Sequence, residues 1–339
     1  MNFSAILNAV LGKSDLSEDN AYDVMSSIMS GELTDSQIAG ILVALRMKGE
    51  TAAEIAGCAR AMRDAATPVK VEGYELVDTC GTGGDRSGTF NVSTAAALIA
   101  AGASVKIAKH GNRSVSSGSG SADVLEVLGV KINAGPQIVE KSIREVGIGF
   151  LFAPVFHQAM KYAIGPRREL AVRTIFNVLG PLSNPARTTR QVIGVFSREM
   201  LDLIPAVAQR LGMQKAWVLH SEDGLDEISV CAATEVVEVT PDSMRRFKIC
   251  PEDLSMKHGS GESVRVSSPE QSADIIRAVL SGTPGPALDM SLLNAAAVIV
   301  AAGLADDIGA ALEIGGDSIQ SGKAKAALAG LVEVSNSSA

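Results

Sequence analysis

Short β-branched stretches alternate with Ala- and Leu-rich stretches of helical length from residue 74 onward, and this alternation constrains the fold most strongly. Strands are expected at 75–80, 104–110, 148–152, 191–196 and 216–220. Gly-rich loops follow the first two strands, and each loop leads into a helix. Units of this kind build a mainly parallel central sheet that is covered by helices. We therefore predict a large α/β domain over residues 74–339.

The first 70 residues carry helix signals instead of strand patterns. Two capping boxes, Thr34 with Gln37 and Thr51 with Glu54, mark helix starts. Apolar residues at helical spacing follow the first box. A second helical stretch begins near Arg167 and runs to the breaker-rich sequence PLSNPA. We predict a small α-helical domain over residues 1–70, to which a helical segment near 167–186 returns.

Composition and charge limit the classes of function. The 339 residues are 46% apolar and 20% charged, which excludes a disordered or fibrous chain. A net charge of −8 and an aromatic content of 4% supply neither a basic field nor stacking platforms, so no nucleic-acid partner is expected. The longest apolar runs are shorter than the ~20 residues of a membrane span, and no signal-peptide pattern is present. Four scattered cysteines are typical of free thiols, and we expect a cytoplasmic protein without a membrane partner.

The first Gly-rich loop, GTGGDRSGTFNVST at 81–94, lies between a predicted strand and a predicted helix. It lacks the Lys-Ser/Thr of a Walker A loop, and Arg86 occupies the position of the third glycine in a dinucleotide fingerprint. The N–H groups of its glycines, with Asn91, Ser93 and Thr94 at the helix start, suit a phosphate group. The alternative is a tight turn followed by an ordinary N-cap.

The second loop, KHGNRSVSSGSGSAD at 109–123, brings Lys109, His110 and Arg113 to the end of a predicted strand. Its serines supply hydroxyl groups, and Ser121 is predicted to cap the next helix. Ligands bind outside the carboxyl ends of the strands in open parallel sheets. The two loops together therefore predict a substrate with more than one phosphate, and the alternative for this loop is a flexible, solvated linker.

An acidic turn follows the last predicted strand. Asp226 and Glu227 lie in the sequence DGLDEIS and offer oxygen ligands to a hard cation. An acidic protein that holds a polyphosphate needs a cation to offset charge repulsion, and Mg2+ commonly uses one or two carboxylates together with phosphate oxygens. We therefore predict Mg2+ here, with a solvated acidic turn as the alternative.

Arg167 and Arg168 are predicted to open a helix after Gly165 and Pro166. A guanidinium group can hold a carboxylate through two parallel hydrogen bonds, so this pair is a candidate carboxylate site. The alternative is a pair of surface arginines. His157 and His220 have no partners at motif spacing and are interpreted as structural.

Five motifs occur in one order along the chain: GTGGD at 81–85, NVST at 91–94, KHGNRSVSSGSGSADVLEVLG at 109–129, RTIFNVLGPLSNPA at 173–186 and GLDE at 224–227. Together they closely resemble the anthranilate phosphoribosyltransferase family of tryptophan biosynthesis, whose fold resembles that of nucleoside phosphorylases. The resemblance spans nearly the whole chain. It implies a homodimer formed through the helical domain, with an active site between the domains. It also implies transfer of the phosphoribosyl group from phosphoribosyl pyrophosphate (PRPP) to the amine of anthranilate, with Mg2+.

The resemblance further implies roles for particular residues. Those expected to surround PRPP are Gly81, Gly84, Asp85, Thr89, Asn91, Val92, Ser93, Thr94, Lys109, His110, Gly111, Asn112, Arg113, Ser114, Val115, Ser116, Ser117 and Ser121. Those expected near anthranilate are Gly81, Asn112, Arg167 and His110, and those expected to serve the metal are Ser93, Asp226 and Glu227. No catalytic acid or base is assigned, because an aromatic amine needs little proton removal before it attacks.

Two other functions stay open at this point. A pyrimidine nucleoside phosphorylase has similar glycine loops but uses free phosphate, whereas NVST and the acidic pair favour a pyrophosphate donor with a metal. A non-catalytic relative that binds nucleic acid would need a basic surface, which a net charge of −8 does not favour.

Overall fold

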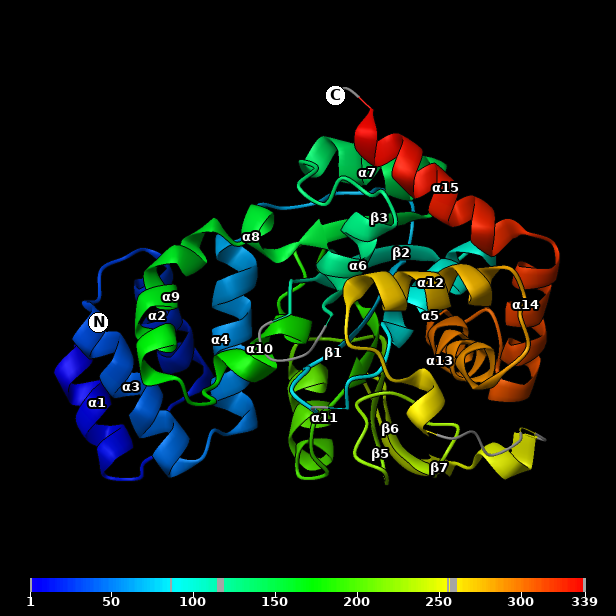
Figure 1. Cartoon of the computed structure of the whole chain (residues 1–339). Helices are drawn as coiled ribbons and strands as arrows, with labels where there is room; N and C mark the ends of the chain where they lie inside the picture. Colours follow the sequence, from blue (N-terminus) through cyan, green and yellow to red (C-terminus); the bar gives the residue numbers. More distant parts are fainter. Residues whose placement is uncertain (1, 86, 115–118, 255, 257–260, 338–339) are drawn as a thin grey trace.

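The computed structural model of the chain describes residues 2–85, 87–114, 119–254, 256 and 261–337. Helices alone make up one end of the molecule (Figure 1). They are α1 (Phe3–Leu11), α2 (Glu18–Met29), α3 (Asp35–Lys48), α4 (Ala52–Ala65) and, from a distant part of the chain, α9 (Lys161–Leu170). Both predicted capping boxes are present: the N–H of Gln37 donates to Oγ1 of Thr34, and the N–H of Glu54 donates to Oγ1 of Thr51, each at 3.3 Å. α9 packs against α2 and α3 and shares their apolar core.

One sheet organises the rest of the described chain. Its strands are β1 (Leu76–Gly81), β2 (Lys106–Gly111), β3 (Ile148–Phe152), β4 (Arg190–Gly194), β5 (Lys215–Ser221), β6 (Thr234–Val239) and β7 (Met244–Ile249). Their order is β3-β2-β1-β4-β5-β6-β7; the first five are parallel and the last two antiparallel. All five predicted strands are present. The chain order reverses between β1 and β4, which is where open α/β sheets bind ligands.

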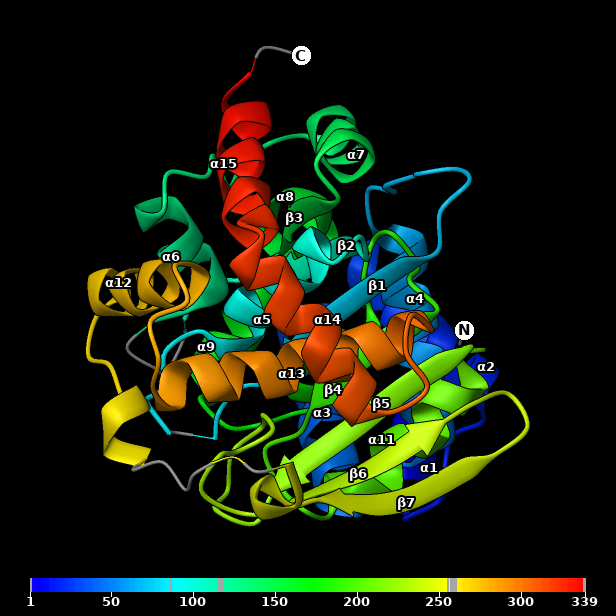
Figure 2. The same cartoon turned by 90° about the vertical axis from the view of Figure 1, so that its right-hand side faces the viewer.

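The antiparallel β6–β7 hairpin was not among the predicted strands. β6 has the sequence TEVVEV, in which apolar and charged residues do not alternate strictly. The turn between β6 and β7 closes where the N–H of Thr240 donates to the carbonyl oxygen of Ser243 at 2.9 Å. β7 forms the edge of the sheet, and Figure 2 shows β5, β6 and β7 side by side. Its exposed arginines and lysine pair with carboxylates, so the edge is charged and discourages strand pairing with other chains.

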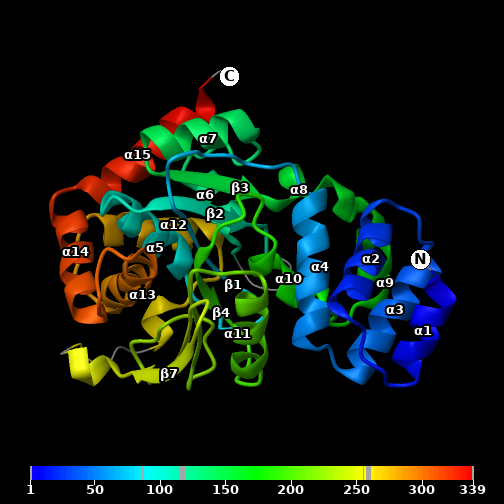
Figure 3. The same ribbon diagram turned by 180° about the vertical axis from the view of Figure 1, so that it is seen from behind.

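Helices cover both faces of the sheet. The first face is packed by α5 (Val92–Gly102) and α13 (Pro286–Ala302), with α6 (Ser121–Val127), α12 (Pro269–Leu280), α14 (Ile308–Gln320) and α15 (Lys323–Asn336) around them. The second face is packed by α7 (Pro136–Glu145), α8 (Ala153–Phe156) and α11 (Met200–Arg210), while α10 (Phe176–Leu182) contacts α4 of the helical part (Figure 3).

Successive residues of a strand contribute their side chains alternately to the cores on the two faces. Val192 and Trp217 point to the first face, whereas Ile193 and Val218 point to the second. Burial on both faces explains why the strands read as nearly continuous apolar runs. The predicted fold class, a small α-helical domain with a larger α/β domain, is confirmed. No described helix is both long and apolar enough to cross a membrane.

Candidate active site

Loops that follow different strands meet at the carboxyl edge of the sheet, next to the point where the strand order reverses. The N–H of Gly83, after β1, donates to Oδ2 of Asp226, after β5, at 3.0 Å. The N–H of Ser93, in the first turn of α5, donates to Oε1 of Glu227 at 3.1 Å. The structure therefore brings the predicted phosphate loop and the predicted metal ligands into direct contact.

Two glycines make room for the turn that carries this acidic pair. At Gly194, the last residue of β4, a Cβ atom would lie 1.7 Å from the carbonyl oxygen of Asp226. At Gly81, the last residue of β1, a Cβ atom would lie 2.2 Å from Oδ2 of Asp226. Any side chain at either position would displace the turn from the sheet edge, so both glycines are needed for close approach.

The acidic turn concentrates negative charge. Asp226 and Glu227 are half-buried, and Asp85 lies against Asp226. Burial, with a smaller contribution from the carboxylate of Asp85, raises the pKa of Asp226 to about 7. Burial and repulsion from Asp226 raise the pKa of Glu227 to about 8, although Lys109 opposes this effect. A cation bound here would stabilise the ionised carboxylates.

Lys109 supplies the positive charge of the site and is almost fully buried, with 1% of it exposed. Its Nζ donates to the carbonyl oxygen of Thr79 at 2.8 Å and to Oγ of Ser93 at 3.2 Å. Burial lowers the pKa of Lys109, while the buried carboxylate of Asp78 on β1 raises it. Lys109 thus links the ends of β1 and β2 to the first turn of α5.

Asn91 joins the two predicted loops to α12. Its Oδ1 accepts hydrogen bonds from Oγ of Ser119 at 2.8 Å and from Oγ of Ser272 at 2.9 Å. Its backbone N–H donates to the same Oγ of Ser272 at 2.9 Å, and its Nδ2 donates to the carbonyl oxygen of Ser119 at 3.3 Å. Ser272 was missed by sequence reasoning because no motif surrounds it. In the first turn of α5, Oγ1 of Thr94 is buried with no hydrogen-bond partner among the described residues.

Arg173 is a second residue that sequence reasoning missed, although it lies within the quoted motif RTIFNVLGPLSNPA. Its guanidinium group donates to the carbonyl oxygen of Gly84 and lies 4.2 Å above the ring centre of Phe196. Gly84 has a φ of +81°, which favours glycine at this point of the first loop. Thr89 and Val92 lie farther along that loop, the first half-buried and the second buried.

The second loop is tied to α6 by charged contacts. Arg113 donates to Oδ1 of Asp123 and to Oε2 of Glu126, each at 2.9 Å. The N–H of Ser114 donates to Oδ2 of Asp123 at 2.9 Å. Two carboxylates therefore offset the charge of Arg113, while Asn112 stays exposed. Val115, Ser116 and Ser117, also predicted to contact PRPP, lie outside the described residues.

The prediction that Ser121 caps α6 is wrong. Gly120 is the N-cap residue, and its N–H donates to Oδ2 of Asp123 at 3.0 Å. The carboxylate of Asp123, the third residue of α6, accepts from the N–H of the N-cap residue, as the acidic residue of a capping box does, while glycine supplies no side-chain cap. Oγ of Ser121 instead donates to the carbonyl oxygen of Asn112 at 3.4 Å, beside Gly111, where a Cβ atom would lie 2.2 Å from that Oγ.

His110 and His157 form a buried pair with ring centres 5.1 Å apart. Nδ1 of His110 lies 3.1 Å from the carbonyl oxygen of Gly180, and the backbone of Ser183 bonds the ring of His157. Because a carbonyl oxygen only accepts, Nδ1 of His110 carries the proton. Burial lowers the two pKa values to about 3 and about 4, so both rings are neutral at pH 7. Nε2 of each ring is buried without a partner among the described residues, and in His110 this nitrogen is an acceptor.

Arg167 lies in the last turn of α9, so the prediction that Arg167 and Arg168 open a helix is wrong. Pro166 sits inside α9 rather than at its start, and the helix ends three residues after Arg167. The guanidinium of Arg167 lies 4.8 Å above the ring centre of Phe176, and burial lowers its pKa. Phe176 opens α10, and Gly180 near the other end of α10 bonds His110, so Arg167 and His110, two of the four residues predicted near anthranilate, both contact α10. Arg168 is exposed.

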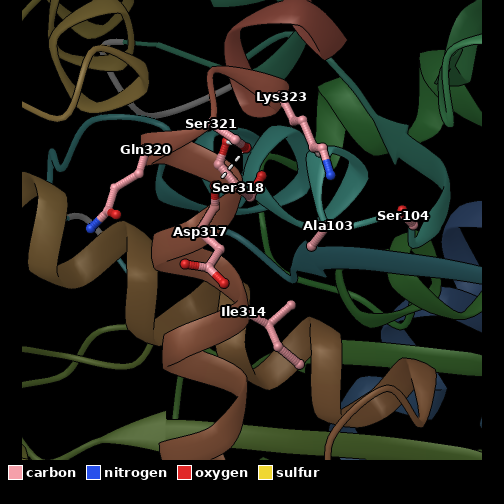
Figure 4. A pocket seen from close by; sticks show the side chains of 9 residues that line it. Ala103, Ser104, Ile314, Asp317, Ser318, Gln320, Ser321 and Lys323 are labelled. Carbon is pink, nitrogen blue, oxygen red and sulfur yellow. Dashed lines mark hydrogen bonds between the residues drawn. The ribbon is translucent and has the colours of Figure 1, made fainter.

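A separate surface pocket of about 580 Å³ lies at the far end of α5 (Figure 4). Its lining includes Ala103, Ser318 and Lys323, the last at the start of α15. Ser93 lies in the first turn of α5, whereas this pocket lies beyond the last turn. None of the predicted site residues that the structure describes lines it.

Comparison with known families defines the class of protein. Residues 4–66 match the helical bundle domain of the glycosyl transferase family, and residues 73–325 match the a/b domain of the same family. The fold and the site therefore define a glycosyl transferase built from these two domains.

Known relatives identify the particular family. The anthranilate phosphoribosyltransferase of Desulfosudis oleivorans is 48% identical over 336 residues, covering 99% of each chain. The crystal structure of anthranilate phosphoribosyltransferase from Thermus thermophilus matches with a TM-score of 0.92 at 42% identity, covering 98% of this chain and 99% of that one. The Saccharomyces cerevisiae enzyme in complex with PRPP and Mg matches at 0.88, and the same enzyme with 4-fluoroanthranilate at 0.87, each at 27% identity over 98% of both chains. This chain belongs to the anthranilate phosphoribosyltransferase family, which confirms the predicted resemblance.

Proposed function

We propose that this chain transfers the 5-phosphoribosyl group of PRPP to the amine of anthranilate, giving N-(5-phosphoribosyl)anthranilate and pyrophosphate. The observation that carries the proposal is the joint placement of the first loop, Lys109 and the acidic pair Asp226–Glu227 at one sheet edge. Family membership supports the reaction. It also favours this reaction over phosphorolysis of a pyrimidine nucleoside and over a non-catalytic role in binding nucleic acid.

PRPP would lie along the two loops. Backbone N–H groups of the glycines after β1 and the amino end of α5 offer donors to phosphate oxygens, and Lys109 adds a fixed positive charge. We assign to PRPP the individual residues that the resemblance implies, which lie between Gly81 and Thr94 and between Lys109 and Ser121. Asn91 serves this assignment mainly by holding Ser119 and α12, because Oδ1 and Nδ2 of its side chain both bond within the protein.

Asp226, Glu227 and Ser93 fit a magnesium ion. The raised pKa values of the two carboxyl groups mark an electrostatic cost that a divalent cation would relieve. No three His, Cys, Asp or Glu side chains converge as a metal centre in the part of the chain that the structure describes. That fits Mg2+, which commonly takes one or two carboxylates from the protein and the rest of its ligands from substrate and water. When bound, it would neutralise charge on the departing pyrophosphate.

In the reaction, the bond between C1 of ribose and the pyrophosphate oxygen breaks, and its electron pair leaves with pyrophosphate. The lone pair of the anthranilate nitrogen forms the new bond at C1, and the nitrogen then loses a proton to solvent. C1 passes through an oxocarbenium-like state, as in glycosyl transfer generally. The protein contributes by positioning both substrates and by stabilising the leaving group, with Lys109 and backbone N–H groups as donors.

Anthranilate would lie between Arg167 and His110 along α10, near Gly81 and Asn112. The partly desolvated guanidinium of Arg167 is suited to the carboxylate of anthranilate. The unprotonated Nε2 of His110 can accept a hydrogen bond from the amine. We therefore assign recognition of the acceptor's carboxylate to Arg167 in the helical segment, and contact with its amine to His110 at the end of β2.

A homodimer through the helical part is the quaternary state that we propose. Large apolar side chains are exposed on neighbouring helices: Leu11 on α1, Val43 and Met47 on α3, and Ile164 on α9, with Met47 80% exposed. Contiguous exposed apolar side chains mark protein interaction sites. We also propose a cytoplasmic location, where the four cysteines, none of which is in a disulfide, would stay reduced.

The test is direct. Purified protein is mixed with anthranilate, and anthranilate fluorescence is followed after PRPP is added with and without Mg2+. We expect fluorescence to fall only when both PRPP and Mg2+ are present. Turnover of thymidine and phosphate without turnover of anthranilate would contradict the proposal, as would a shift of DNA in a gel without turnover.

A further inference from the structure

We propose that Asn294 is a positioning residue that holds the Asp226–Glu227 turn in its productive place, an inference that rests on the proposed function. Asn294 lies in α13, which packs against β4 and β5 on the first face of the sheet (Figure 2). It is 2% exposed, and Ala295, Ala296 and Ala297 follow it in a strongly apolar helix. An amide in such a place costs free energy unless its donors and acceptor are satisfied.

All three hydrogen bonds of the Asn294 side chain have good geometry, and two of them go to one residue. Oδ1 accepts from the N–H of Ile228 at 2.9 Å, and Nδ2 donates to the carbonyl oxygen of Ile228 at 2.9 Å. Nδ2 also donates to the carbonyl oxygen of Met290, again at 2.9 Å. The side chain therefore pairs with Ile228 as a neighbouring strand would, at the point where the turn runs beyond the sheet.

Ile228 follows Glu227 directly, so this pairing fixes the backbone that carries both acidic side chains. The turn lies between β5 and β6, outside both strands, so the main-chain groups of Ile228 need a side-chain partner, which Asn294 supplies. Gly83 and Ser93 hold the carboxylate oxygens from the side of the sheet edge. Asn294 holds the main chain of the same turn through both backbone groups of Ile228.

The experiment compares Asn294→Leu and Asn294→Ala with Ser291→Ala. Leucine keeps the number and branching of the side-chain heavy atoms but cannot form the hydrogen bonds, and alanine is the usual neighbour in this part of α13. Ser291 is the matched control: it lies in the same helix, is also buried, and its Oγ donates to the carbonyl oxygen of Ala287, in its own helix, at 2.7 Å. The measurements are the Mg2+ concentration for half-maximal rate, the two KM values, and amide hydrogen exchange in metal-free protein.

We expect both Asn294 variants to need about 10–100-fold more Mg2+, as found when partners of metal ligands are removed. The KM for anthranilate stays within about twofold, and Ser291→Ala behaves like the unmodified protein. Exchange at Gly83 and Ser93 becomes faster, although Asn294 touches neither residue. A role limited to packing would accelerate exchange only around Ile228 and α13, and that result would overturn the inference.

A parallel Asp226→Asn, Glu227→Gln variant distinguishes a failure of the positioning role of Asn294 from a failure of the proposed function. Suppose that the double variant loses its Mg2+ dependence while both Asn294 variants need the same Mg2+ concentration as the unmodified protein. The positioning role of Asn294 is then wrong, and the proposed function stands. If the double variant responds to Mg2+ as the unmodified protein does, the proposed metal site fails and the inference fails with it. Should the leucine variant not fold, hydrogen exchange and Mg2+ titration of the alanine variant decide the question.

Discussion

The N–H of Gly83 donates to the carboxylate of Asp226 at 3.0 Å, although the two residues lie 143 positions apart in the chain. This bond joins the loop after β1 to the turn after β5 across the end of β4. The same turn is held to the first turn of α5 through Ser93 and Glu227. The proposed phosphate-binding loop and the proposed cation-binding turn thereby lie in one site, and the following predictions test its parts.

Replacing Asp226 by Asn together with Glu227 by Gln removes the charge of the turn and keeps its shape. We expect an intact fold, a sharply reduced turnover and a weaker dependence on Mg2+, because the protein would lose its carboxylate ligands. Rates are measured over a range of Mg2+ concentrations at saturating PRPP. Normal kinetics at limiting Mg2+ would contradict the metal role of the pair.

Lys109→Met retains the length of the side chain and removes its charge. We expect kcat/KM for PRPP to fall by about 100-fold or more, the scale seen when a fixed donor to developing negative charge is removed. Lys106→Met is the control, since Lys106 lies on the same strand and donates to the carbonyl oxygens of Ile143 and Arg144 outside the site. Equal losses of kcat/KM in the two variants would show that Lys109 stabilises strand β2 and has no particular role toward PRPP.

Arg167→Ala is expected to raise the KM for anthranilate far more than the KM for PRPP, because Arg167 is assigned to the acceptor's carboxylate. The neighbouring Arg168 is exposed and provides the control Arg168→Ala. Steady-state kinetics with each substrate varied in turn make the comparison. A similar loss for both substrates would count against a selective role for Arg167.

Because burial keeps His110 and His157 neutral, the free energy of unfolding depends on pH. The pKa of His157 is about 4 in the folded protein, well below its ordinary value of 6.5, so between these pH values the unfolded chain binds more protons than the folded one. Lowering the pH from 7 to 5 therefore costs stability through this group, by about 2 kcal/mol. The stability advantage of the unmodified protein over His157→Gln shrinks by that amount in chemical unfolding at the two pH values. An unchanged difference, or imidazole NMR signals of His157 that titrate near pH 6.5, would contradict its burial as a neutral ring.

Met47→Glu places a charge in the exposed apolar surface of α3. We expect this change to convert the proposed dimer to a monomer, measured by analytical ultracentrifugation, because an unpaired charge in an apolar interface is costly. Met244→Glu on β7 is the control, since Met244 is also exposed but lies on the far sheet edge. A monomeric unmodified protein, or a dimer that persists in the Met47 variant, would refute this interface.

Local signals made much of the fold predictable. The capping boxes at Thr34 and Thr51 and the apolar strand cores depend on neighbours in sequence, and the structure contains all of them. The β6–β7 hairpin was not predicted, because apolar and charged residues do not alternate strictly in its strands. β7 is rich in charged residues because it forms an exposed edge of the sheet. The start of α9 was misplaced because Pro166, usually a mark of the first helical turn, lies in the interior of that helix.

Only the candidate site residues that lie within short sequence motifs could be predicted from the sequence. Glycine loops, Lys109 and the acidic pair stand out in sequence because their chemistry is concentrated in short segments. Ser272 and Asn294 are buried polar residues that lie outside the motifs, and nothing beside them in sequence reveals that they bond Asn91 and Ile228. Their roles follow from packing between distant segments, which spacing in one sequence does not encode.

The most direct measurement of the central claim is a crystal structure of the protein with PRPP and Mg2+. The account predicts that the pyrophosphate lies against the loop from Gly81 to Thr94, beside Lys109, with a magnesium ion at Asp226 and Glu227. PRPP bound away from these residues, or a metal ion that avoids both carboxylates, would contradict it.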